Sequence, residues 1–157
     1  MVAKIRRDDM LRAASMPAAL CIAYILLSYE QYKLTGNAGS VWLFTVLSDW
    51  IGLHGYEAPF RWSVGLAEIA ASLLVLVPAT RMLGALLALG IMSGAIFFHL
   101  ASPLGIDPYG DGGRLFKEAC GVWLAAALIL AARRDELRPL IRRLRMFEFV
   151  PFRRVPG

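Results

Sequence analysis

Four apolar stretches recur along the chain, and each is close to the length that a helix needs to cross a lipid bilayer. At a rise of 1.5 Å per residue, roughly 17–20 helical residues cover a hydrocarbon core of about 30 Å. Backbone polar groups in lipid must be satisfied inside the segment, which favours helices. The pattern therefore predicts an all-α fold, a membrane four-helix bundle with spans at about residues 13–32, 61–77, 82–101 and 115–132.

A fifth apolar stretch, residues 41–53, is shorter and contains Asp49. It is too short to cross the bilayer comfortably, and we expect a short interfacial or re-entrant helix on the outer side. The aromatic residues in and after it are typical of a membrane–water interface, namely Trp42, Trp50, Tyr56 and Trp62.

Lysine and arginine are divided unequally between the two ends of the predicted bundle. With both termini inside, the outer side holds only Lys33, Arg61, Arg114 and Lys117. The inner side holds Lys4, Arg6, Arg7, Arg12, Arg81, Arg133, Arg134, Arg138, Arg142, Arg143, Arg145, Arg153 and Arg154. This bias obeys the positive-inside rule and predicts a multi-pass protein of the cytoplasmic (inner) membrane, with both termini cytoplasmic.

Composition supports a membrane protein with a single domain. Of the 157 residues, 58% are hydrophobic and 18% are charged, which leaves little polar surface for a soluble domain. The net charge of +5 reflects basic residues that flank the spans, so we expect contact with anionic lipid and no binding of nucleic acid. Residues 1–136 form the predicted domain. Residues 137–157 form a basic cytoplasmic tail that begins as an amphipathic helix.

Ionisable residues gather toward the outer end of all four spans: Glu30, Lys33, Arg61, Glu68, His99, Arg114, Lys117 and Glu118. Such groups are costly inside a membrane unless they are paired or wet. Glu68 is the deepest, about 10 Å below Arg61 along one helix. Beneath His99, Gly90 and Gly94 form a pair that predicts a close contact with another helix.

Several kinds of site fit this polar cluster. The first is an ion-paired cap, in which Glu68 pairs with a basic partner such as Arg114 or Lys117 and Glu30 pairs with Arg61 or Lys33. The second is a pocket for a quinone or similar amphiphile, because a carboxylate and an imidazole can exchange protons with a quinone oxygen.

In the quinone pocket, Glu68 and His99 are the candidate catalytic pair. The candidate ligand-binding residues around them are Lys33, Glu30, Arg61, Arg114, Lys117 and Glu118.

A metal site is a weaker alternative, because one histidine and scattered carboxylates match no ligand spacing, and we predict none. A proton or solute pathway is a further alternative, but the inner half of the bundle lacks the polar residues that it would need.

The loop at residues 102–113 is predicted to form a set of tight turns, or a lid that carries Asp107, Tyr109 and Asp111 over the polar cavity.

Between residues 30 and 133 the chain resembles the DoxX family of small four-helix membrane proteins. The resemblance rests on the order and spacing of Tyr32-Lys-Leu, Gly65-x-x-Glu68, Gly94-Ala-Ile-x-x-His99-Leu, Gly105-Ile and Asp111-Gly-Gly-x-Leu-Phe116. It implies a cytoplasmic-membrane protein linked to redox processes, with relatives associated with thiosulfate:quinone oxidoreduction and with oxidative-stress complexes. It also directs attention to Lys33, Glu68 and His99, which match the motif.

The sequence thus predicts a DoxX-like subunit that binds a quinone-like molecule within a redox assembly. The chain has no dinucleotide fingerprint, haem-attachment motif or iron–sulfur spacing, so we expect no covalently bound cofactor, only a diffusible quinone or a partner redox subunit. The alternative is a non-catalytic membrane scaffold or accessory subunit that docks a partner protein. Whether the protein is an enzyme stays open at this point.

Overall fold

The computed structural model describes residues 2–135, and the regular structure in this part of the chain is entirely helical. Its five helices are α1 (Val2–Thr35), α2 (Ala38–Trp50), α3 (Glu57–Leu76), α4 (Arg81–Ala101) and α5 (Arg114–Ala132). The predicted all-α class is confirmed. The expected tail helix, residues 137–157, lies outside the described residues.

Four of these helices are long and apolar enough to cross a membrane: Ala13–Thr35, Glu57–Leu76, Arg81–Ala101 and Arg114–Ala132. The predicted number of spans is confirmed for the described residues. The first helix begins at Val2, well before its apolar part, because the preceding polar segment contains no helix breaker.

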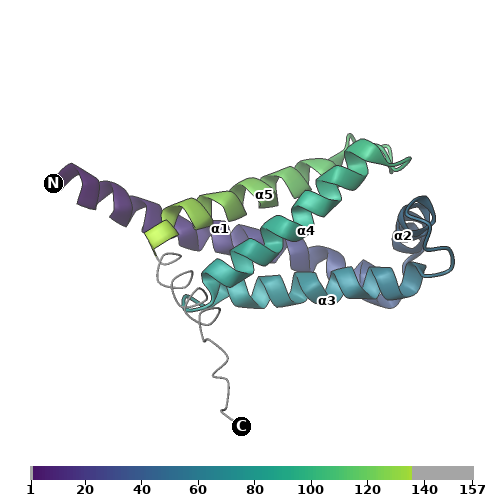
Figure 1. Ribbon diagram of the computed structural model, residues 1–157, viewed down its shortest axis with the longest axis horizontal. Coiled ribbons are helices and arrows are strands. Elements are labelled where there is room, and N and C mark those ends of the chain that lie inside the picture. Colours follow the sequence, from purple (N-terminus) through teal and green to yellow (C-terminus); the bar gives the residue numbers. More distant parts are fainter. Residues whose placement is uncertain (1, 136–157) are drawn as a thin grey trace, which may run out of the picture.

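The long helices form a ring in which neighbours run in opposite directions (Figure 1). Both α1 and α4 pack against α3 and α5, whereas α1 and α4 barely meet. The shared core consists mostly of small and branched apolar side chains, which let the helices approach closely: Ala19, Ile22, Ala71, Val75, Ala85, Ala88, Val122, Ala126 and Ile129.

The backbones of α3 and α4 approach each other closely near the turn between them. A Cβ atom built on Gly84 would lie 2.2 Å from the backbone nitrogen of Val75. Arg81 strengthens the same turn, since its guanidinium donates to the carbonyls of Val75 and Leu76 at the end of α3. Glycine is therefore the residue that this helix crossing requires.

The short helix α2 lies at the opposite end of the bundle, where α1 ends and α3 begins (Figure 1). We call this the polar end. The side chain of Asn37 accepts a hydrogen bond from Gly39 N and caps α2. Aromatic rings connect α2 to its neighbours, with Phe44 against Phe60 on α3 and Trp50 against Phe98 on α4. The stretch that we judged too short to span thus forms a separate helix across the polar end.

Candidate functional site

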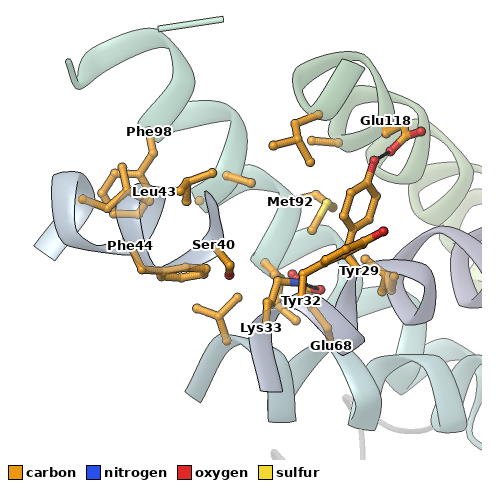
Figure 2. Close-up of a pocket in the computed structure, with 18 of the residues that line it drawn as sticks. Tyr29, Tyr32, Lys33, Ser40, Leu43, Phe44, Glu68, Met92, Phe98 and Glu118 are labelled. Carbon is orange, nitrogen blue, oxygen red and sulfur yellow. Dashed lines mark hydrogen bonds and ion pairs between the residues drawn. The ribbon is translucent and has the colours of Figure 1, made fainter. Parts of the chain in front are cut away.

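A cavity of about 800 Å³ opens at the polar end and is lined by residues of all five helices. Its walls are mainly apolar, and Figure 2 shows Leu43, Phe44, Met92 and Phe98 on its sides. Ionisable side chains of four helices, α1, α3, α4 and α5, line it: Tyr29, Lys33, Glu68, His99, Arg114 and Glu118. A mostly apolar cavity with a few convergent polar groups is the usual form of a small-molecule site.

An ion-paired set is centred on Lys33, and two of its members, Lys33 and Glu68, line the cavity, whereas Glu30 does not. The Lys33 ammonium lies 3.0 Å from Glu30 Oε1 and also donates to Glu68 Oε2. Both carboxylates are nearly buried. The predicted pairing of Glu30 with Lys33 is confirmed, whereas the pairing of Glu68 with Arg114 or Lys117 is wrong. Glu68 faces α1 across the α1–α3 contact, so the end of α1 supplies its partner.

Glu30 is held against the backbone of α3. A Cβ atom at Gly65 would lie 2.7 Å from Glu30 Oε2, so only glycine leaves room for this carboxylate in its present position. Among the described residues, Oε2 has no hydrogen-bond partner. A buried, unsatisfied carboxylate oxygen is unfavourable, and two carboxylates sharing one ammonium leave this set with an excess negative charge when both are ionised.

Arg61 has a structural position beside this set, outside the cavity lining. Its Nη1 donates to the carbonyl of Lys33 near the end of α1, and its Nε pairs with Glu57 Oε1 at 2.5 Å. A cation at the carboxyl end of a helix complements the helix dipole and the free carbonyl groups there. The predicted pairing of Arg61 with Glu30 is not found, because Glu57 one turn away takes its place.

A second polar group joins α1 to α5 on the other side of the cavity. Tyr29 donates its hydroxyl proton to Glu118 Oε2, and Arg114 Nε lies 2.9 Å from Glu118 Oε1. Figure 2 shows the Tyr29 ring projecting across the cavity toward Glu118. Sequence reasoning missed Tyr29, although its spacing of four residues from Lys33 places the two on one face of α1.

His99 reaches the cavity from α4 without contacting either carboxylate set. Its Nδ1 lies 2.6 Å from the carbonyl oxygen of Gly105, and its ring stands edge-on to Phe116. A carbonyl only accepts, so Nδ1 carries the proton and Nε2 is an acceptor in the neutral ring. Nε2 has no hydrogen-bond partner among the described side chains and backbone. His99 and Glu68 line the same cavity but do not form a direct pair.

The loop between α4 and α5 folds over the polar end. Tyr109 donates to the carbonyl of Gly39 at 2.9 Å and packs against Trp42, which ties the loop to α2. Tyr109 and Asp111 line the cavity, whereas Asp107 does not. The partial burial of Tyr109, with Asp111 nearby, raises the pKa of its hydroxyl.

Asp107 organises the turns of this loop. Its carboxylate accepts from the backbone nitrogens of Asp111 at 2.9 Å and Gly112 at 3.2 Å. Backbone N–H groups, that of Gly113 foremost, hold the pKa of Asp107 below its ordinary value. Gly113 itself has φ +73°, a conformation that favours glycine, directly before α5 begins.

Two further predictions about the site are corrected by its geometry. Lys117 is exposed and is not among the residues that line the cavity. Gly90 and Gly94 do not mediate a helix contact, since a Cβ atom at either would meet nothing within 4 Å. Both glycines line the cavity, so their missing side chains contribute to its volume.

Within the described part of the chain, no group of three or more His, Cys, Asp or Glu side chains could hold a metal ion. Comparison of the chain with protein-family models, with curated proteins and with solved structures finds no match. The resemblance to the DoxX family therefore rests on the sequence motifs alone. The chain is a small all-α protein with four helices long and apolar enough to span a membrane.

Proposed function

We propose that this protein is a DoxX-like membrane subunit whose cavity binds a quinone-like molecule in a redox-associated assembly. The observation that carries the proposal is the shared cavity at the polar end, where Lys33, Glu68 and His99 reach a mostly apolar space. A volume near 800 Å³ lies within the range of small-molecule sites and accommodates a substituted ring.

The polar groups suit the chemistry of a quinone head. One carbonyl oxygen of the ring accepts a hydrogen bond from the Lys33 ammonium, and the hydroxyl of the reduced form donates to His99 Nε2. Quinone reduction takes up two electrons and two protons. Glu68 and His99 are the groups that would hold these protons, because a carboxyl group and an imidazole both exchange protons readily.

The electrons must come from a partner redox subunit, which supplies the oxidation that balances quinone reduction. On this proposal the protein provides the quinone site of a larger assembly. In the scaffold alternative, a partner protein docks on the basic tail, which lies outside the described residues, or on the outer helix α2, where Trp42 and Trp50 are exposed.

Ligand binding can be tested on the purified protein in lipid nanodiscs. We expect quinone in the lipid extract of the protein purified from its native membrane. We also expect a short-chain benzoquinone to raise the unfolding temperature. A ligand that binds only the folded state at a hundred times its Kd adds about 2.7 kcal/mol of stability.

Two variants and one control test whether the rise in unfolding temperature comes from quinone bound in the cavity. His99→Gln and Glu68→Gln are expected to weaken the quinone-dependent shift, because they remove the proton-accepting groups with little change in side-chain size. Lys117→Gln removes an exposed charge at the same end of the bundle and should leave the shift unchanged. Absence of quinone from the extract, together with no shift in the natural protein, would reject the proposal.

A further inference from the structure

A shallow apolar hollow on the surface of α4 shares two lining residues with the cavity. This hollow is lined by Leu83, Leu86, Leu87, Gly90 and Ile91, and the last two residues also line the main cavity. Leu83 and Leu86 are about half exposed, although they are large and apolar. On a membrane-spanning helix, such a surface faces hydrocarbon.

Gly90 is one of the two residues that line both spaces. This glycine is exposed, and a Cβ atom there would meet nothing within 4 Å. A larger side chain at this position would extend into the open space that the missing side chain leaves. Gly90 is nine residues from His99 and nine from Arg81, so it lies at the middle of α4, about 14 Å below the polar groups.

At the polar end, side-chain contacts join the loop to α2, and α2 to α4. The Tyr109 hydroxyl bonds to Gly39, its ring packs on Trp42, and Trp50 packs on Phe98. These contacts draw the loop, α2 and α4 together above the cavity. An apolar chain leaving there would also enter the polar interfacial region, whereas one leaving beside Gly90 would stay in hydrocarbon.

We infer that the ligand of this cavity carries a long hydrocarbon chain, which leaves the bundle beside Gly90 and lies along the outer face of α4. This inference rests on the proposed binding site and adds the class of ligand, a bilayer-soluble amphiphile with its head at Lys33, Glu68 and His99. The membrane is then both the source of the ligand and the solvent of its tail.

The first experiment compares two quinones with the same head, one with a short side chain and one with a long isoprenoid chain. The natural protein in nanodiscs is expected to bind both. Gly90→Leu should weaken binding of the long-chain quinone at least tenfold and leave the short-chain quinone within twofold. Gly121→Leu is the matched control, because Gly121 also has open space around it but does not line the cavity.

The second experiment needs no variant and so does not depend on folding. A long-chain quinone with a photoreactive diazirine in its chain is bound to the natural protein and irradiated. Labelling of the peptide that contains residues 83–91 supports the lateral passage. Labelling confined to α2 or to the loop at residues 102–113 overturns it.

The two proposals fail in different ways. If the short-chain quinone binds and the long-chain quinone does not, the lateral passage is wrong and the binding site stands. Gly90→Leu could weaken binding of both quinones equally while Gly121→Leu weakens binding of neither. In that case the position of the labelled peptide decides whether the lateral passage is accepted or rejected. If neither quinone binds the natural protein, the proposed function fails and the inference fails with it.

Discussion

At the scale of single residues, the set formed by Lys33, Glu30 and Glu68 carries more negative than positive charge when both carboxylates are ionised. One ammonium faces two nearly buried carboxylates, and Glu30 Oε2 lacks a hydrogen-bond partner among the described residues. The neighbouring cation, Arg61, is paired with Glu57. A shared proton would balance this set, and so would a ligand that donates to Glu68, which lines the cavity. The same imbalance that costs stability therefore provides a place for protons.

Lys33→Met should destabilise the protein by about 3–5 kcal/mol, because it leaves buried carboxylates without their cation. Unfolding by denaturant in mixed micelles measures the change. The triple variant Lys33→Met, Glu30→Gln and Glu68→Gln should recover most of the loss, since no charge then remains in the set. Lys117→Met changes an exposed lysine and should stay within about 0.5 kcal/mol of the natural protein. Equal losses in the single and triple variants would show that charge is not the cause.

At the scale of helices and loops, glycines have opposite functions at different positions. Gly84 allows the backbones of α3 and α4 to touch, whereas Gly90 and Gly94 leave open space beside the cavity. All three lie on α4, and the residue type alone does not distinguish them. The surroundings of each missing Cβ decide whether a glycine serves packing or volume.

Gly84→Ala should therefore be strongly destabilising, by about 3 kcal/mol, because its Cβ would overlap the backbone of α3, which cannot move aside as a side chain can. Gly94→Ala is the matched change on the same helix and should be neutral or slightly stabilising, since alanine favours a helix by roughly 0.5–1 kcal/mol over glycine. Unfolding midpoints of the two variants test this. Similar losses in both would contradict the packing assigned to Gly84.

The loop between α4 and α5 should depend on pH through Asp107. Backbone N–H groups lower the pKa of this carboxyl in the folded loop. Its contribution to loop stability is thus present above the unfolded pKa, near 3.9, and is lost as pH falls through the lower folded value. The protection of the Asp111 and Gly112 amides against hydrogen exchange, relative to the intrinsic exchange rate at the same pH, should fall as the carboxyl becomes protonated.

Asp107→Ala removes this dependence and should give low protection of the loop amides, relative to the intrinsic exchange rate, at every pH. Asp49→Ala, which changes an exposed carboxylate outside the loop, is the control and should keep the pH dependence of the natural protein. Identical pH profiles for Asp107→Ala and the natural protein would assign the effect to another group.

At the scale of the whole molecule, four spans place the beginning of the first and the end of the last on one side of the membrane. The end of the bundle that carries α2, opposite the amino terminus in Figure 1, then faces the other side, and the cavity lies at this polar end. The excess of arginine near the termini predicts that their side is cytoplasmic.

Cysteines introduced at Ser102 and Asp135, in a background without Cys21 and Cys120, test this topology. A membrane-impermeant thiol reagent added to intact cells should label residue 102 and not residue 135. Labelling of both, or of neither before the cells are opened, would contradict an even number of spans with a cytoplasmic carboxyl end.

The sequence by itself determined the number of spans, the helical class and the separate status of α2. Length and hydrophobicity are properties of a continuous segment, and the bilayer imposes one length on all segments that cross it. The gathering of Glu30, Lys33, Glu68 and His99 at one end follows from the same reasoning, because the rise of a helix fixes the depth of each residue.

The tertiary structure alone decided which of these residues meet. The depth of Glu68 along its helix is compatible with several cations as partners. The rotation of α1 against α3 places Lys33, and no other of these cations, beside it. Rotation also joined Tyr29 to Glu118 and turned Gly90 and Gly94 toward open space. Ion pairs and cavities depend on how helices are rotated and packed, which is a property of the whole bundle that no single segment encodes.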